Sequence, residues 1–208
     1  FKFEEHVSYV VTLLQLISDE DLTGVYGTSA EKALMYHRQN QDIFNSTCAP
    51  AIQRYTGVVY DHIRWSSLEK KEQDFLNKYV YIISGLFGIL SPKTLIPDYK
   101  LKMNVLSLQS HWNPVITEEL KNEDVIFDLL PQVHRKAYNA GKNVIQIDFS
   151  VLNKNGKKSA AGHFGKAVKG ELIRFIAKNQ VKKLDDFYDF EYDGFQWDGK
   201  AFIKNLEN

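Results

Sequence analysis

The chain has 208 residues, 44% of them hydrophobic and 25% charged, and its 26 basic residues balance its 26 acidic residues to a net charge of zero. This length suits one domain with a substantial core, and the balanced charge excludes a polycation. No apolar run approaches the roughly 18 residues that a membrane helix needs, and no leader precedes the fold, so we expect a cytoplasmic protein that does not bind membranes. The lone Cys48 excludes an internal disulfide and a cysteine metal cage.

Hydrophobic periodicity predicts the elements of the first half of the chain. Residues 4–17 repeat apolar positions at helical spacing, and a polar turn follows over residues 19–27. Thr28 or Ser29 is expected to cap a second helix to about residue 39, with Glu31 placed to close a capping box from Thr28. Beyond these we expect a mixed segment over residues 49–60 that ends in a short helix over residues 60–63. A longer helix is expected over residues 68–78, and a central strand covered on both faces over residues 79–84.

The second half alternates helices and strands. Helices are predicted over residues 114–121 and 131–139, and a strand over residues 125–129. Residues 143–152 alternate polar and apolar side chains, and Asn155-Gly156 is a strong hairpin signal that joins this strand to residues 157–161. A long helix over residues 162–180 precedes a closing hairpin of residues 195–197 and 201–204. Together they predict one compact α/β (α+β) domain over residues 1–208, with a mixed β-sheet surrounded by helices.

The first candidate site is the turn before the second helix. A helix-hairpin-helix binds a phosphate oxygen through backbone N–H groups at the start of its second helix, and glycine in the turn lets the DNA backbone approach. Here two glycines precede the helix, although their spacing departs by one residue from the common Gly-x-Gly. The alternative is an ordinary helix–helix corner. The DNA-contacting residues of such a hairpin would be Gly24, Val25, Tyr26, Gly27, Thr28 and Lys32.

Charge is unevenly distributed near the C-terminus. Residues 154–183 hold nine basic side chains and one acid, Glu171, whereas residues 185–198 hold six acids and no base. Such asymmetry is typical of a face that binds polyanions, but the two segments could equally neutralise each other within the fold. The acidic neighbours argue against base stacking by the aromatic residues there, which are expected to pack in the closing hairpin: Tyr188, Tyr192, Phe195 and Trp197.

The helix of residues 162–180 has a basic side and an apolar side. Lys166 and Lys169 fall on its solvent side, and Lys157 and Lys158 of the preceding hairpin could extend their stripe. Lysines in this arrangement neutralise phosphates without reading bases, which predicts salt-dependent binding that tolerates any sequence. Arg174 lies near enough to Glu171 to pair with it and is therefore the weaker candidate for a DNA ligand. The core side is expected to hold Phe164, Ala167, Val168, Leu172, Phe175 and Ile176.

The same region raises an enzymatic alternative. Its residues fit a phosphate-loop pattern, so Gly162, Gly165 and Lys166 could bind the phosphate of a nucleotide or another phosphorylated small molecule. Ala167 stands where a Ser or Thr should hold Mg²⁺, which argues against phosphoryl transfer. The six histidines and Cys48 show no spacing typical of a catalytic or metal site, so we expect no catalytic residue, no metal and no cofactor.

Several segments together carry a resemblance to a known family. Residues 83–92 read ISGLFGILSP and residues 98–103 read DYKLKM, an apolar strand and glycine turn followed by a Tyr/Lys/Met segment. Their order and spacing with the further blocks resemble the YaaA-like family of bacterial peroxide stress-response proteins, over about three-quarters of the chain. Those further blocks are AIQRYTGVVY at residues 51–60, the triplet Trp112, Ile116 and Leu120, the triplet Asn155, Gly156 and Lys157, and residues 164–176.

The resemblance implies a function. The family is implicated in defence against hydrogen peroxide, where its members limit free intracellular iron and spare DNA from Fenton damage, and a helix-hairpin-helix-like element is associated with it. It therefore implies a cytoplasmic, non-catalytic protein that binds double-stranded or branched DNA through the phosphate backbone, and we expect a monomer. This chain lacks the apolar strand with which the family opens, and it departs from the family pattern at Ser91, Asn104, Val168 and Lys169.

Overall fold

The structure is a computed structural model that describes residues 1–206, and it has a mixed α/β fold, as predicted. The chain divides into two compact units, so a single domain over the whole chain stays a prediction. None of the helices within the described residues has the length and apolar character that crossing a bilayer requires. The N-terminal unit comprises Phe1–Arg54, Val80–Ile126 and Leu130–Val144, and the C-terminal unit comprises Tyr55–Tyr79, Phe127–Leu129 and Ile145–Asn208.

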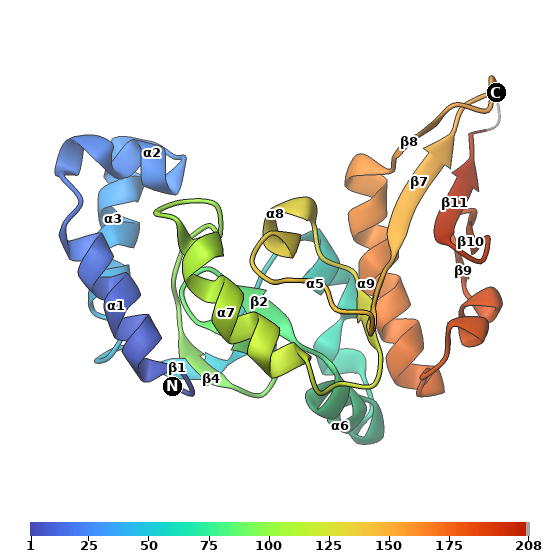
Figure 1. Cartoon of the computed structure of the whole chain (residues 1–208), viewed down its shortest axis with the longest axis horizontal. Helices are drawn as coiled ribbons and strands as arrows, with labels where there is room; N and C mark the ends of the chain where they lie inside the picture. The colour runs from blue at the N-terminus through green and yellow to red at the C-terminus, as the bar shows by residue number, and fades with distance from the viewer. Residues whose placement is uncertain (207–208) are drawn as a thin grey trace. The chain divides into compact units, whose positions relative to one another are not determined.

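The N-terminal unit combines helices with two short antiparallel strand pairs, in which β1 pairs with β4 and β2 with β3. In this unit α1 packs against α3 (Figure 1). Its elements are α1 (Glu4–Gln15), η1 (Asp19–Asp21), α2 (Leu22–Tyr26), α3 (Ala30–Gln41), β1 (Cys48–Pro50), α4 (Ala51–Arg54), β2 (Ile82–Ser84), β3 (Gly88–Leu90), β4 (Leu95–Pro97), α7 (Leu108–Leu120) and α8 (Gln132–Arg135). Strands β5 (Ile126–Asp128) and β6 (Val144–Gln146) each contain a residue at which the chain changes from one unit to the other.

The family-like segment at residues 83–92 forms the core of the N-terminal unit. Trp112 is fully buried, and its indole N–H donates to the Gly85 carbonyl at 2.9 Å. Its ring lies against Gly88, which has a φ of +72°, and a Cβ there would lie 2.5 Å from the ring. The Ser84 hydroxyl accepts a hydrogen bond from the N–H of Phe87 at 2.9 Å and lies 2.7 Å from the Tyr99 hydroxyl. The close packing and the hydrogen bonds among these residues explain why the segment has these side chains.

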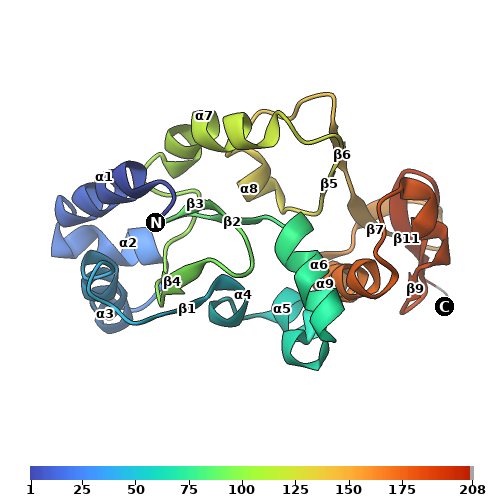
Figure 2. The same ribbon diagram turned by 90° about the horizontal axis from the view of Figure 1, so that it is seen from below.

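The C-terminal unit is built on a five-stranded mixed sheet of order β8-β7-β11-β10-β9, in which β7 and β11 are parallel and the other pairs antiparallel. Helix α9 packs on this sheet through Val168 and Leu172, and α5 and α6 lie beside α9 (Figure 2). The elements are α5 (Val58–Ile63), η2 (Trp65–Ser67), α6 (Lys70–Tyr79), β7 (Asp148–Leu152), β8 (Lys158–Ala160), α9 (Gly162–Asn179), η3 (Leu184–Asp189), β9 (Glu191–Tyr192), β10 (Phe195–Trp197) and β11 (Ala201–Asn205).

Most of the predicted elements are confirmed, including α1, α3, α9 and both hairpins, with Gly156 in the left-handed region at φ +70°. Several details are wrong. The helix expected over residues 114–121 begins at Leu108 with Pro114 inside it, and the helix expected over residues 131–139 ends at Arg135. Residues 22–26 form α2 instead of a turn, and α3 begins after Ser29 without a side-chain cap, so the capping box from Thr28 is absent. The strand over residues 143–152 breaks at Ile147, whose N–H donates to the Asp128 carbonyl at 2.9 Å. Strand β2 is buried as expected, but within the described residues it pairs with β3 alone.

Replacing Gly88 by alanine tests the packing of Trp112. We expect Gly88→Ala to lower the free energy of unfolding by roughly 1–3 kcal/mol, because the new Cβ would overlap a buried ring at a backbone conformation that disfavours side chains. Urea unfolding followed by tryptophan fluorescence measures the change. The matched control is Gly24→Ala in α2, where a Cβ would meet nothing within 4 Å, so its stability should stay or rise slightly. Equal stability of the two variants would contradict the packing role of Gly88.

Candidate nucleic-acid interface

Helices α2 and α3 are joined by a short turn that contains Gly27. Gly27 ends α2 in the left-handed conformation at φ +61°, and its N–H donates to the Thr23 carbonyl at 2.8 Å. Ser29 is the N-cap of α3 but makes no side-chain hydrogen bond to the helix. The first N–H groups of a helix have no partner within the helix, so those of α3 remain available to solvent or to a ligand. The helix N-terminus also carries partial positive charge, which favours an anion such as a phosphate.

The side chains of the hairpin residues divide between core and surface. The Tyr26 hydroxyl lies 3.3 Å from His37 Nδ1 and accepts from Asn40 Nδ2 at 3.2 Å. Burial raises the pKa of Tyr26 to about 12, although the Asn40 hydrogen bond acts in the opposite direction. The Asn40 amide also donates to the Lys100 carbonyl at 2.8 Å and accepts from the Lys100 N–H at 3.1 Å. The Tyr26 side chain is therefore part of the core, and only its main chain could contact a ligand. Among the other predicted hairpin residues, Gly24, Gly27 and Lys32 are exposed and Val25 and Thr28 are half-buried.

Lys102 is a cation at this turn that sequence reasoning did not assign to it. Its ammonium occupies the space that a Cβ on Gly27 would fill. The side chain is exposed. In the sequence, Lys102 stands out only as part of the DYKLKM segment. Its contact with a turn far away in the chain leaves no local pattern from which it could be predicted. The turn is not uniformly basic, since three exposed acids precede α2, namely Asp19, Glu20 and Asp21.

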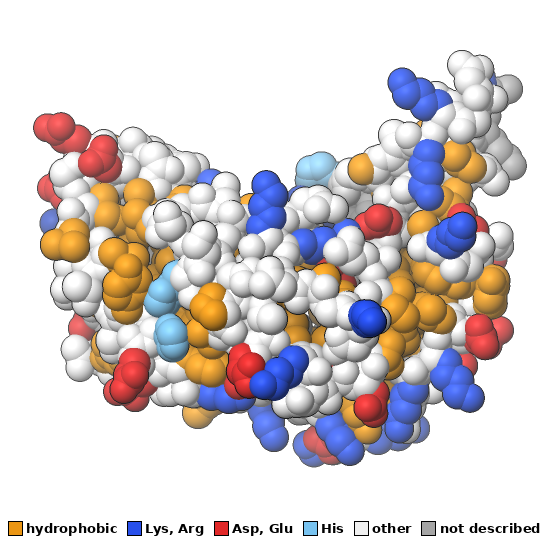
Figure 3. Space-filling model, in the orientation of Figure 1, with side chains coloured by type: hydrophobic (Ala, Val, Ile, Leu, Met, Phe, Trp, Pro, Cys, Tyr) orange, Lys and Arg blue, Asp and Glu red, His pale blue; other side chains and the backbone are white. Residues whose placement is uncertain are grey.

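The β7–β8 hairpin carries two of the predicted lysines. Lys158 is paired with Leu152, which is itself paired with Asn205, so these three side chains share one face of the sheet. Lys157 lies in the connection before β8. Lys and Arg side chains follow this hairpin on the surface (Figure 3). Both lysines are exposed on the hairpin.

Lys158 has an acidic neighbour on its own face. It lines an open groove together with Trp197 and Asp198. Partial burial acts to raise the pKa of Asp198, but hydrogen bonds from the N–H groups of Ala201 and Lys200 and the charge of Lys158 hold the pKa below its ordinary value. Lys158 and Asp198 thus interact within the fold, as the alternative for this charge pattern expects of oppositely charged residues.

Helix α9 differs from its predicted faces at two positions. Lys166 is exposed, as expected, but Lys169 is half-buried and donates to the Leu129 carbonyl at 2.6 Å. The Lys169 ammonium also lies 5.4 Å from the centre of the Phe149 ring. Phe164 was expected in the core and is 62% exposed. Lys166 therefore has the freer side chain of the two lysines, and Lys169 has a packing role.

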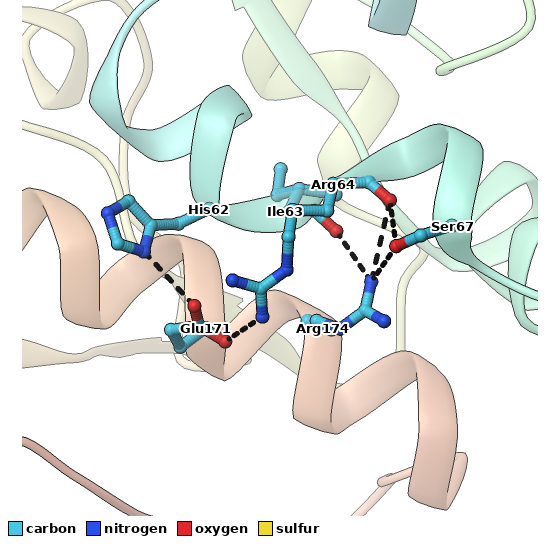
Figure 4. A network of polar contacts seen from close by, with 6 residues as sticks. All are labelled: His62, Ile63, Arg64, Ser67, Glu171 and Arg174. Carbon is cyan, nitrogen blue, oxygen red and sulfur yellow. Dashed lines mark hydrogen bonds and ion pairs between the residues drawn. The ribbon is translucent and has the colours of Figure 1, made fainter.

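A polar network holds α9 against α5 (Figure 4). Glu171 accepts from Arg64 Nη2 at 2.8 Å, and its other oxygen lies 3.0 Å from His62 Nδ1. The Arg174 Nη1 donates to the Ile63 carbonyl at 3.1 Å and to the Ser67 hydroxyl at 2.9 Å. The expected pairing of Glu171 with Arg174 is therefore wrong. Arg174 instead binds the main chain at the C-terminal end of α5, where helix carbonyls lack partners.

A phosphate-binding loop would have to lie at Gly162–Lys166, and the chain forms no loop there. Only Ala161 separates β8 from α9, so Gly165 and Lys166 lie within the helix. Gly165 is buried, its N–H is directed to the Ala161 carbonyl at 3.3 Å, and a Cβ there would lie 3.4 Å from Phe149 Cβ. Gly162 opens the helix at φ +54°. These glycines serve helix start and helix–sheet packing, and within residues 1–206 no three His, Cys, Asp or Glu side chains gather to hold a metal ion.

Comparison with known proteins places these features in context. A family model described as "Peroxide stress protein YaaA" matches residues 1–201. The chain is 28% identical over 213 aligned residues to a "UPF0246 protein" from Streptococcus pneumoniae strain CGSP14 and to another from strain D39 / NCTC 7466. Each alignment covers 95% of this chain and 88% of the relative.

Replacing Arg174 separates a structural role from a ligand role. We expect Arg174→Gln to lower the free energy of unfolding by about 1–2 kcal/mol, because the carbonyl and hydroxyl that it binds lose a charged donor. Urea unfolding measures the change. Lys178→Gln, an exposed position further along α9, is the control and should shift stability by less than about 0.5 kcal/mol. If Arg174→Gln is as stable as this control but binds DNA less tightly, Arg174 is a ligand and its structural assignment is wrong.

Proposed function

This chain belongs to the peroxide stress protein YaaA family, and from this premise we propose that it is a non-catalytic DNA-binding protein of the response to hydrogen peroxide. In this proposal it contacts double-stranded or branched DNA through phosphates, without reading the base sequence. The bound protein shields the DNA from Fenton chemistry. We further propose that the protein limits free intracellular iron, as the family resemblance implies. The stress-response role follows from the family, whereas DNA binding rests on the geometry of the chain.

The α2–α3 turn is the observation that carries the proposal. Gly27 supplies a left-handed residue without a side chain, and the uncapped start of α3 supplies unpaired N–H groups. Two lysines add charge, because the Lys102 ammonium lies at Gly27 and Lys32 lies in the first turn of α3. Main-chain donors at a helix start, backed by cations, match the oxygens of one phosphate and are indifferent to the base beside it.

The second element of the proposal lies in the C-terminal unit. Lys157 and Lys166 are exposed and stand on the hairpin and helix that follow one another along the chain. Lys158 and Lys169 already have neighbours within the fold, so they contribute less to phosphate binding. The proposal therefore gives Lys157 and Lys166 the greater part of the phosphate contacts in this unit.

Charge removal in three matched pairs tests the proposal. Lys32→Gln/Lys102→Gln removes charge at the hairpin, Lys157→Gln/Lys166→Gln removes it at the C-terminal unit, and Lys178→Gln/Lys183→Gln is the control. Fluorescence anisotropy measures binding to duplex, four-way-junction and single-stranded DNA between about 50 and 200 mM salt. We expect wild-type binding of micromolar affinity or tighter, and each test pair should lower the salt slope by about 1 per lysine that contacts a phosphate.

The control pair carries the same loss of charge at two exposed positions that are not assigned a phosphate contact, Lys178 in the last turn of α9 and Lys183 after the helix. It should leave the salt slope unchanged. Wild-type protein that binds none of the three DNAs at the lowest salt would refute DNA binding. A control pair that weakens binding as much as the test pairs would show that net charge acts without a defined site.

A further inference from the structure

Phe164 is an exposed aromatic ring at a position where the helix pattern calls for a buried one. Phe164, Val168 and Leu172 follow one another at helical spacing, and the latter two are fully buried. Phe164 is nevertheless 62% exposed, although Ala161 and Gly165 beside it are buried. Leaving a phenylalanine ring in water forgoes a large part of the stabilisation that its burial would give. The ring is therefore a surface feature, and its neighbours indicate what it binds.

A cation lies over this ring, and further basic residues stand near it in the chain. The Lys204 ammonium lies 5.6 Å from the centre of the ring, and Lys204 is paired with Val151, which puts it on the face of the sheet that packs on α9. Lys157 is exposed in the hairpin that precedes α9, and His163 and Lys166 are exposed in the first two turns of the helix. One acid, Asp193, is 2.9 Å from Lys204 and is neutralised by it.

The same unit contains a second ring of equal exposure in the opposite electrostatic setting. Tyr188 is also 62% exposed, but it lies in η3 beside Asp185, Asp186 and Asp189. A polyanion is repelled at Tyr188 and attracted at Phe164. Exposure alone does not distinguish the two rings, whereas charge complementarity selects Phe164 for contact with a nucleic acid.

We propose that Phe164 is a stacking platform for an unpaired base of a bound DNA strand. The proposal rests on the DNA binding proposed above and adds a preference for sites where the duplex is open. Every base has a π-face, so stacking on an aromatic ring is tolerant of sequence, and the neighbouring cations neutralise the phosphates that flank the stacked base. Bases in an intact duplex are already stacked on one another, so the ring has no partner there.

Substitution of the ring tests this role. The variants are Phe164→Leu, which keeps an apolar side chain without a π-face, and Phe164→Trp, which keeps a π-face. Tyr188→Leu is the matched control. Binding is measured by anisotropy with an intact duplex, the same duplex containing a single-stranded gap, and the single strand alone, and thermal melting confirms that each variant is folded.

We expect Phe164→Leu to weaken binding to the gapped and single-stranded DNA by about 5-fold or more, the loss of one stacked base, and to leave duplex affinity within about 2-fold. Phe164→Trp should bind like wild type, and Tyr188→Leu should change neither affinity. A base analogue such as 2-aminopurine placed in the gap should lose fluorescence on binding wild type and Phe164→Trp, and should lose less with Phe164→Leu.

The outcomes separate this inference from the proposed function. If wild type binds DNA but Phe164→Leu binds open and paired DNA as wild type does, the proposed function stands and the stacking role is wrong. Equal losses in the Leu and Trp variants also exclude stacking, because a π-face would then make no difference. If wild type binds no DNA, both fall. If wild type self-associates without DNA and Phe164→Leu abolishes that association, the ring is a contact between copies of the chain.

Discussion

Helix α9 lies so close to α5 at Gly170 that no side chain fits between them. A Cβ on Gly170 would overlap the Val59 carbonyl and would lie 2.5 Å from the Cβ of His62. This contact sets where the helix axis runs, and the polar residues beyond it then reach their partners: Glu171 contacts His62 and Arg64, and Arg174 reaches the end of α5. One glycine therefore governs how α9 is anchored to α5.

The segments that carry the family resemblance hold two kinds of residue, those that pack in the core and those that we propose for DNA binding. Ser84, Gly88 and Trp112 are buried and fit one another closely. Lys102 and Lys166 are exposed and need only bring a charge to a phosphate. A close-packed interior admits few side chains at each position, whereas a phosphate accepts any well-placed cation. The core is consequently easy to recognise in a sequence, and the binding surface has to be located in space.

Local patterns were sufficient to predict α1, α3, α9 and the two hairpins, because apolar spacing and turn chemistry lie within each segment. They missed α2, whose five residues form a helix around the burial of Leu22 and Tyr26. They also missed the true partners of Glu171, which lie 107 and 109 residues away in the chain. Periodicity shows which side of a helix is apolar but not which of its residues the rest of the fold covers, so the exposure of Phe164 was not predictable. The contact of Lys102 with the hairpin is long-range in the same way.

The hydrogen bonds of the Asn40 amide reduce the entropy that a ligand would lose on binding at the α2–α3 turn. The amide donates to one main-chain group of Lys100 and accepts from the other, as a neighbouring β-strand would, and it also donates to the buried Tyr26 hydroxyl. Helix α3 cannot rotate about its axis without breaking these bonds, so the turn at its start keeps one shape before any ligand arrives. Ordering of the hairpin belongs to the folding reaction, and a ligand that meets it finds little conformational entropy left to remove.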